Sequence, residues 1–182
     1  DLKEKFKKEN IIIENSSISN SGAIEQQVGL EESHVRPGIM MYGPSSIIPM
    51  YSHLSCWKGE IISRLETYVI RSIEVKKGQP IGYGGTPCSD DGVVAIIALG
   101  YGDGFSTRYM GAHLEHNGKI GVVAGRVNMD MAQIFFKKGD EPKFKAGDAF
   151  TVWDHDLEKF QQLAIETKTL TYELFIQLTN RV

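Results

Sequence analysis

The sequence has few cysteines and no long run of one kind of residue. Of its 182 residues only Cys56 and Cys88 are cysteines, and neither belongs to a CxxC motif. This excludes a disulfide framework and a structural zinc site, and reduced thiols are typical of cytoplasmic proteins. The formal net charge is -3 without a basic run, so we expect no nucleic-acid partner. No apolar run approaches the ~20 residues that cross a bilayer, so we expect no membrane partner.

Sequence motifs for nucleotides and metals are missing as well. The glycine-rich segments GYGGTP and GYGDG match neither a Walker A loop nor a Rossmann dinucleotide fingerprint. His113 and His116 in HLEH have the spacing of metal ligands, but no third ligand cluster accompanies them. We therefore expect these histidines at the surface and no metal site.

The composition is that of a globular protein, and the first third of the chain has α/β character. Hydrophobic residues make up 41% of the sequence and charged residues 24%, which is enough to form a core. Residues 2–8 favour a helix, and the apolar run at residues 11–15 predicts a buried parallel strand. A second helix is expected after the candidate N-caps Ser19, Asn20 and Ser21. These features are typical of an α/β barrel.

From about Ser55 the pattern changes to β. Alternating and β-branched residues predict a long strand over residues 60–75, ended by the turn KKGQ. Further strands are expected in PIGYGG, GVVAIIAL, GKIGVVAG, VNMDMAQIFF and AFTVWD, in the manner of a sandwich or barrel. Two helices follow, the first of them after an aspartate. The expected fold class is mainly β with some α, with a second domain beginning near residue 55.

One segment, VAIIALGYGDGFSTR, passes from an apolar strand into glycines around Tyr101 and Asp103. The glycines allow a sharp turn that would hold a side chain rigidly at the end of the strand. A phenol has an ordinary pKa near ~10, so it needs a neighbouring cation or a hydrogen-bond relay to act as a base. From this segment alone, Tyr101 is either a catalytic residue or a packed side chain beside a hairpin turn.

Three further segments carry polar residues beside predicted elements. In GRVNMDMAQIFF they are Arg126, Asn128, Asp130 and Gln133. This pattern suits either solvent-facing alternation or an anion site formed by the Met129 N–H and Arg126. SNSGA is either a plain N-cap or an anion cradle at a helix start. Arg36 in VRPGIMMYG is either a surface charge or a donor to a cofactor at the end of a barrel strand.

Taken in order, SISNSGA, VRPGIMMYG, IGYGGT, IALGYGDGF, GRVNMDM and TYELFIQLTNRV resemble the C-terminal half of alanine racemases, which are pyridoxal-phosphate (PLP) enzymes of fold type III. The resemblance covers nearly the whole chain. It implies that residues 1–54 are the last strand and helix elements of a PLP-binding (β/α)8 barrel and that residues 55–182 are the C-terminal β-barrel-like domain. It also implies a cytoplasmic homodimer with an active site shared across the interface. Its substrate would be a small amino acid, with L- and D-alanine interconverted by a two-base mechanism to supply peptidoglycan synthesis.

The resemblance also implies roles for individual residues. Tyr101, from the family's GYADG motif, would be the base specific for the L-enantiomer, and Met129 would bind the substrate carboxylate, largely through its backbone amide. The PLP phosphate would be bound by Ser21, Gly38, Ile39 and Tyr172. Arg36 would donate to the pyridine nitrogen, and because arginine keeps its proton, racemisation would be favoured over transamination.

The sequence departs from the family pattern in three respects. The PLP-binding lysine and the substrate-binding arginine of the barrel are absent, so we expect the chain to be the C-terminal part of a longer enzyme and to be inactive alone. Ser17 stands where the family often has a histidine that supports the arginine. Gly102 replaces the alanine of the GYADG motif.

Alternative functions stay open at this point. A serine racemase or a broad-specificity amino-acid racemase is one, because a small pocket separates a methyl from a hydroxymethyl group poorly. A non-catalytic β module used for dimerisation is another. Decarboxylases with the same two-domain plan lack the tyrosine turn followed by GRVNMD, so they are less favoured than either of these alternatives.

Overall fold

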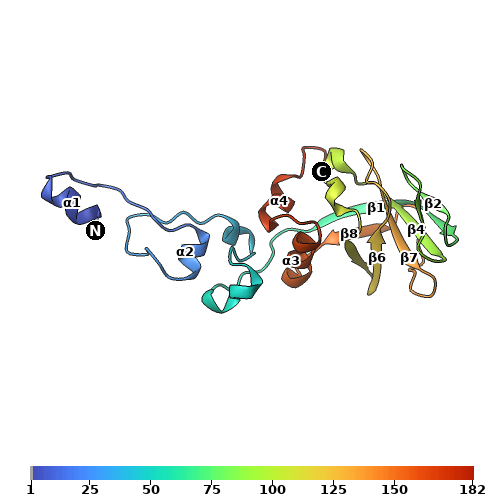
Figure 1. The fold of residues 1–182 in the computed structure, drawn as a ribbon, viewed down its shortest axis with the longest axis horizontal. Coiled ribbons are helices and arrows are strands. Elements are labelled where there is room, and N and C mark those ends of the chain that lie inside the picture. Colours follow the sequence, from blue (N-terminus) through green and yellow to red (C-terminus); the bar gives the residue numbers. More distant parts are fainter. Residues whose placement is uncertain (1) are drawn as a thin grey trace. The chain divides into compact units, whose positions relative to one another are not determined.

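A computed structural model describes residues 2–182, and the chain divides into two compact units between Glu60 and Ile61 (Figure 1). The N-terminal unit contains α1 (Leu2–Lys8), α2 (Ser21–Glu25) and the 3-10 helices η1 (Ile39–Tyr42) and η2 (Pro49–Leu54). Of the three candidate N-caps of α2, Asn20 is the one the structure uses: its side-chain oxygen accepts the N–H of Ala23 at 3.0 Å. The helices expected over residues 2–8 and after the SNS segment are both confirmed.

The buried strand expected at residues 11–15 is wrong. These residues form no strand, and the side chain of Ile12 is 87% exposed. A parallel strand is stabilised only by neighbours that pair with it on both sides. Among the described residues of the N-terminal unit, the parallel pairing is limited to an isolated bridge between Asn20 and Arg36. That this unit is the end of a (β/α)8 barrel stays a prediction.

The C-terminal unit is built on one antiparallel sheet, so the chain is mainly β with few helices. Its strands are β1 (Leu65–Val75), β4 (Gly92–Ile97), β5 (His113–His116), β6 (Lys119–Val123), β7 (Ala132–Lys137) and β8 (Ala149–Trp153). They run in the order β5-β6-β7-β4-β1-β8, and a separate pair joins β2 (Pro80–Ile81) to β3 (Thr86–Pro87). The helices α3 (Leu157–Glu166) and α4 (Thr171–Ile176) lie at one end of this sheet (Figure 1).

The two edge strands of the sheet approach each other, which gives it a nearly closed, barrel-like form. On β5, the ring of His116 stacks on the ring of Phe150 of β8, with centroids 4.9 Å apart and planes inclined by 5°. Closure of this kind covers the strand edges that an open sheet would expose. His113 of the same strand is exposed, as expected, whereas His116 is partly covered by this contact.

The central strand β7 is buried on both faces. Ile134 and Phe136 belong to the main core, and Phe135 packs in a second cluster on the opposite face. Gln133 is also buried, so the solvent-facing alternation considered for this segment does not hold for it, whereas Arg126 and Asp130 are exposed. Residues 127–131, expected at the start of the strand, form a bend instead, because the Asn128 N–H donates to the Met131 carbonyl at 2.9 Å and closes a turn.

Several other expected elements are confirmed with shifted ends. The long strand expected over residues 60–75 begins only at Leu65. The helix α3 begins after an aspartate, as expected, with Asp156 accepting the N–H of Lys159 at 3.1 Å. Within residues 2–182, no helix is both long and apolar enough to cross a membrane.

Candidate functional site

Tyr101 begins a short turn that is closed on itself by hydrogen bonds. The turn is the 3-10 helix η3 (Tyr101–Asp103), which three residues, 98–100, separate from the end of the strand β4. The Asp103 carboxylate accepts the N–H of Gly100 at 2.8 Å, while the Gly100 carbonyl accepts the N–H of Asp103 at 3.0 Å. Gly104 ends the turn with a φ of 102°, a conformation that favours glycine. The sharp, rigid turn expected from GYGDG is therefore present.

A second segment, residues 126–131, is bonded to this turn. The Tyr101 N–H donates to the Asn128 carbonyl at 2.9 Å, and the Gly102 N–H donates to the Met129 carbonyl at 2.7 Å. These two bonds bring the GYGDG and GRVNMD motifs together, although the residues in each bonded pair are 27 positions apart in the sequence. Within residues 2–182 the Met129 N–H donates no hydrogen bond, so it is the backbone donor that this residue offers to a ligand.

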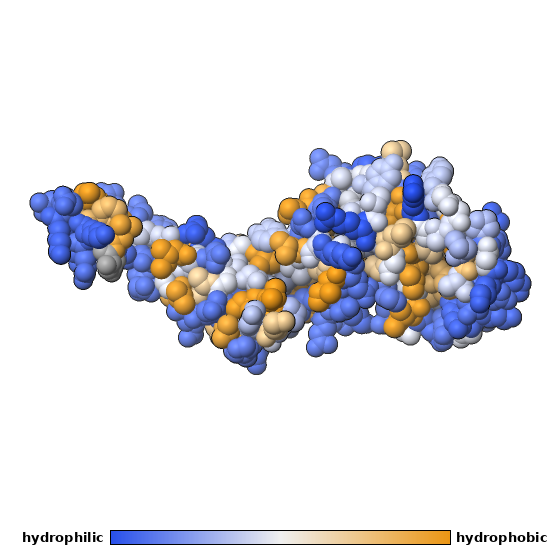
Figure 2. Space-filling view, viewed as in Figure 1, coloured by the Kyte–Doolittle hydropathy of each residue, from blue (hydrophilic) through white to orange (hydrophobic). Residues whose placement is uncertain are grey.

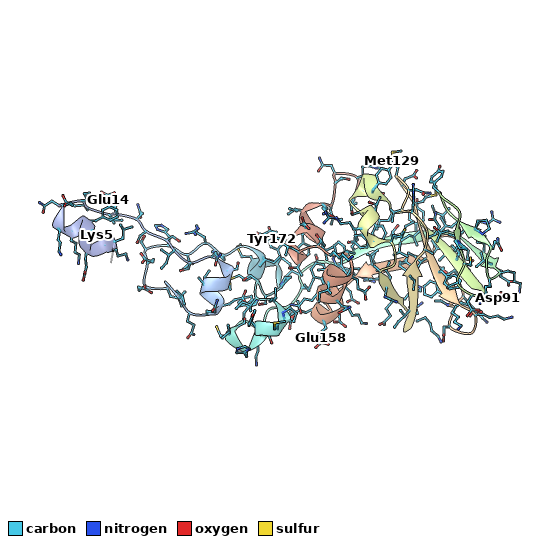
Figure 3. The ribbon with its side chains drawn as sticks, in the orientation of Figure 1. Lys5, Glu14, Asp91, Met129, Glu158 and Tyr172 are labelled. Atoms are coloured by element: carbon cyan, nitrogen blue, oxygen red, sulfur yellow. The ribbon has the colours of Figure 1, made fainter. Side chains whose placement is uncertain are left out.

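Tyr101 and Met129 face a common cavity of about 810 Å³ in the C-terminal unit. Its lining also includes the side chains of Tyr83, Met110 and Arg126. All five side chains are exposed; Tyr101 is 51% and Met129 55% exposed. Figure 3 labels Met129 at the surface of this unit, beside the short yellow-green helices of residues 101–109. The arrangement presents a phenol, an amide N–H and a guanidinium to solvent in one place.

A second tyrosine near the site has a different environment. Tyr109 is buried and its ring packs against Phe105 with centroids 3.9 Å apart. Burial raises the pKa of the Tyr109 phenol above its ordinary value. Tyr109 is therefore a core residue, and Tyr101 is the tyrosine of this segment that a ligand can reach.

In the N-terminal unit, the two segments expected to bind an anion lie in contact. The Ser21 hydroxyl at the start of α2 accepts the N–H of Gly38 at 2.7 Å, immediately before η1 begins at Ile39. The Gly38 N–H is thus used internally, whereas the Ser21 hydroxyl keeps its own proton to donate. The starts of α2 and η1 leave further backbone N–H groups unpaired by their helices, as helix starts do. Hydroxyl and N–H donors of this kind suit a phosphate group.

Arg36 is held by Ser17, the residue that replaces the family's histidine. One guanidinium nitrogen, Nη1, donates to the Ser17 carbonyl at 2.7 Å and to the Ser17 hydroxyl at 2.8 Å. Two acceptors on one residue fix the end of a long side chain that would otherwise be free to rotate. The loss of the histidine therefore does not leave Arg36 without support.

Tyr172 belongs to the other unit, on the first turn of α4, where it is partly exposed. Its expected role at the phosphate stays a prediction, as do the roles of the other site residues. No cluster of three or more histidine, cysteine, aspartate or glutamate side chains within residues 2–182 is arranged to hold a metal ion.

The sequence patterns missed two groups of residues. Glu25 is buried, and its carboxylate accepts the Ser46 N–H at 2.7 Å and the Ser55 hydroxyl at 2.7 Å. Arg181 lies with its Nε 3.1 Å from Oδ1 of Asp103. Both partnerships join residues far apart in the sequence, so no local spacing marks them.

Comparisons with known proteins agree with the fold and the motifs. The family model described as "Alanine racemase, C-terminal domain" matches residues 62–182. The alanine racemase of Mannheimia succiniciproducens is 37% identical over 175 residues, covering 92% of this chain and 46% of the relative. That of Vibrio cholerae is 37% identical over 151 residues, covering 81% of this chain and 40% of the relative. The chain thus spans about half the length of the curated relatives it matches.

Solved structures give the same result. The alanine racemase of Bacillus anthracis with bound L-Ala-P is 27% identical, with a TM-score of 0.84 over 100% of this chain and 47% of that one. The biosynthetic alanine racemase of Pseudomonas aeruginosa is 28% identical, with a TM-score of 0.81 over 100% of this chain and 50% of that one. The chain belongs to the alanine racemase family.

Proposed function

We propose that this chain is part of a PLP-dependent alanine racemase and that it supplies one of the two bases of the reaction. The observation that supports this most directly is the pairing of the Tyr101 turn with the Met129 segment through two backbone hydrogen bonds, at 2.9 Å and 2.7 Å. Both side chains face the same exposed cavity. A family member needs this combination of a reachable phenol and an adjacent amide N–H.

In this proposal Tyr101 removes the α proton of the L-enantiomer and returns a proton to that face when the D-enantiomer reacts. The Met129 N–H binds the substrate carboxylate, and the Arg126 guanidinium adds positive charge beside it. Proton transfer by a positioned side chain contributes roughly 10²- to 10⁴-fold to a rate. Orientation of the phenol by its turn is therefore a substantial part of catalysis.

The exposure of the cavity supports a homodimer with a shared site. Tyr83, Tyr101, Met110 and Met129 are large side chains that leave much of their surface uncovered. Exposed clusters of aromatic residues and methionine are typical of interfaces. Figure 2 shows hydrophobic residues at the surface of each unit. We infer that the cavity faces the active site of the other subunit.

PLP, when bound, withdraws electrons from the substrate's α carbon, which makes its proton acidic. The donors in the N-terminal unit fit this cofactor: the Ser21 hydroxyl and the Ile39 N–H suit its phosphate, and Arg36 suits an unprotonated ring nitrogen. The contact between Ser21 and Gly38, 2.7 Å long, holds the phosphate donors of the two segments together. The contacts from Ser17 hold Arg36 in a fixed orientation.

The second base of the family is a lysine that also binds PLP, and it belongs to a motif that this sequence does not contain. We therefore propose that the 182-residue chain alone does not racemise amino acids, and that the reaction requires the remainder of the barrel. The alternative is a β module that serves only for dimerisation. The substrate is alanine, with serine as the second candidate, and the product D-alanine would serve peptidoglycan synthesis in the cytoplasm.

The experiment is to assay the full-length protein and the 182-residue chain side by side. Racemisation of L-alanine and L-serine is followed by chiral chromatography, with and without added PLP. We expect PLP-dependent conversion by the full-length protein, faster with alanine, and none by the chain alone. A full-length protein that dimerises but converts neither amino acid would support the β module instead.

A further inference from the structure

The last residues of the chain hold the Tyr101 turn from outside. The Thr179 N–H donates to the Asp103 carbonyl at 3.1 Å, and the Thr179 hydroxyl donates to the Gly102 carbonyl at 2.9 Å. Arg181 adds an ion pair to Asp103 at 3.1 Å. In Figure 1 the C-terminus accordingly lies beside the yellow-green helices of residues 101–109. We call Thr179 and Arg181 together the C-terminal clamp.

Asp103 passes the effect of the clamp to the residue before the tyrosine. Its carboxylate is nearly buried and uses both oxygens, Oδ1 toward Arg181 and Oδ2 toward the Gly100 N–H. Burying a carboxylate is costly unless it is paired and hydrogen-bonded. Arg181 supplies the pairing charge, so it stabilises the conformation in which Asp103 and Gly100 enclose Tyr101.

Gly102 provides the space that the clamp needs. A Cβ at this position would lie 2.5 Å from Nη1 of Arg181 and 2.8 Å from the Met129 carbonyl oxygen. The guanidinium therefore crosses the turn where the family's GYADG motif carries a methyl group.

The phenol of Tyr101 depends on its backbone for orientation. Among the hydrogen bonds of residues 2–182, none is made by the Tyr101 hydroxyl, and about half of this side chain is exposed. We propose that Arg181, with Thr179, is a positioning residue for Tyr101, which keeps the phenol aimed for proton transfer to and from the L-enantiomer. This inference rests on the proposed function, in which Tyr101 is the L-specific base.

The test uses the full-length protein with Arg181→Gln, Thr179→Val and Arg181→Lys. Amide hydrogen exchange of a peptide covering residues 98–105 is measured by mass spectrometry, and loss of α-deuterium to water is measured separately for L- and D-alanine. For Arg181→Gln we expect roughly tenfold faster exchange in the peptide and roughly tenfold slower deuterium loss from L-alanine, as for one lost charge-assisted hydrogen bond. Deuterium loss from D-alanine should stay within about twofold, because the other base removes that proton.

Matched variants separate positioning from general stability. Arg64→Gln removes an arginine that is equally exposed, 52% for each side chain, and whose partners are Glu66 of β1 and Thr151 of β8. It should change neither measurement. Arg181→Lys keeps the charge and should recover part of both effects, and Thr179→Val should resemble a milder Arg181→Gln.

Two results would overturn the proposal: unchanged exchange of residues 98–105 in Arg181→Gln, or an equal loss for L- and D-alanine. Failure of the proposed function has a different signature. In that case Tyr101→Phe also leaves deuterium loss from L-alanine unchanged. That result would rule out both the catalytic role of Tyr101 and the positioning role of Arg181, whatever the amide exchange shows.

Discussion

The carboxylate of Asp103 accepts the N–H of Gly100 at 2.8 Å, which encloses Tyr101 in a ring closed within its own turn. The residue before the tyrosine, Gly100, is thereby fixed. The same carboxylate faces Arg181, so one buried group joins the strand end, the turn and the C-terminal segment. Mutation of Asp103 should therefore show how much this carboxylate stabilises the C-terminal unit.

Asp103→Asn should destabilise the C-terminal unit by about 1–2 kcal/mol, because the amide keeps the shape but loses the charge that Arg181 and the Gly100 N–H stabilise. Urea unfolding followed by Trp153 fluorescence in a Trp57→Phe background measures this. The control is Asp140→Asn, whose side chain is 67% exposed and pairs with Lys119 at 3.8 Å. A loss as small as that of Asp140→Asn would show that Asp103 does not stabilise the turn.

Gly104→Ala should destabilise the same unit more than Gly111→Ala does. Both glycines have positive φ, 102° and 88°, so both substitutions cost about 1–2 kcal/mol of backbone strain. Only at Gly104 would the new Cβ also lie 2.2 Å from the Gln177 carbonyl oxygen, whereas nothing lies within 4 Å at Gly111. Urea midpoints of the two variants measure the difference. Equal midpoints would contradict the close approach of the C-terminal segment to the turn.

The N-terminal unit should lose stability in acid as the Glu25 carboxylate becomes protonated. Burial raises the pKa of its carboxyl, but the hydrogen bonds from Ser45, Ser46 and Ser55 outweigh burial and lower the pKa below its ordinary value of 4.5. A lowered pKa in the folded state gives stability that is present above the unfolded value and is lost as pH falls through the folded one. As pH falls below about 4.5, the wild-type chain should therefore progressively lose stability that Glu25→Gln never had.

Trp57 fluorescence in a Trp153→Phe background measures this prediction, because Trp57 lies in the N-terminal unit, where its ring N–H donates to the Gly43 carbonyl at 3.0 Å. Glu31→Gln, at an exposed position, is the control. Parallel pH profiles for the wild type and Glu25→Gln would contradict the prediction.

The β domain was the part of the fold most open to prediction from sequence. β4 and β8 carry apolar runs bounded by turn residues, and the start of α3 is marked by the capping Asp156. The strand predicted at residues 11–15 is wrong because an apolar run indicates burial but does not show which neighbours would cover it. The strand predicted to begin at residue 127 is wrong at its start because the bond from the Asn128 N–H to the Met131 carbonyl closes a turn, which alternation of apolar and polar residues does not reveal.

The residues of the candidate site were likewise only partly predictable from the sequence. Tyr101 and Met129 were found because each belongs to a motif with a family counterpart, and the structure brings these motifs together. Arg181 and Glu25 were not found, because their partners are distant in sequence: Asp103 for the first, and three serines for the second. A long-range ion pair leaves no spacing pattern in a single sequence.

The role of Tyr101 is tested most directly by deuterium loss from the α carbon of L- and D-alanine in full-length Tyr101→Phe. Phenylalanine keeps the ring and removes the hydroxyl, so the turn and cavity should be preserved. We predict that deuterium loss from L-alanine falls by at least about a hundredfold, the lower range for a missing acid–base group, while loss from D-alanine stays within about threefold. An equal fall for both enantiomers, or no fall for either, would contradict the assignment of Tyr101 as the L-specific base.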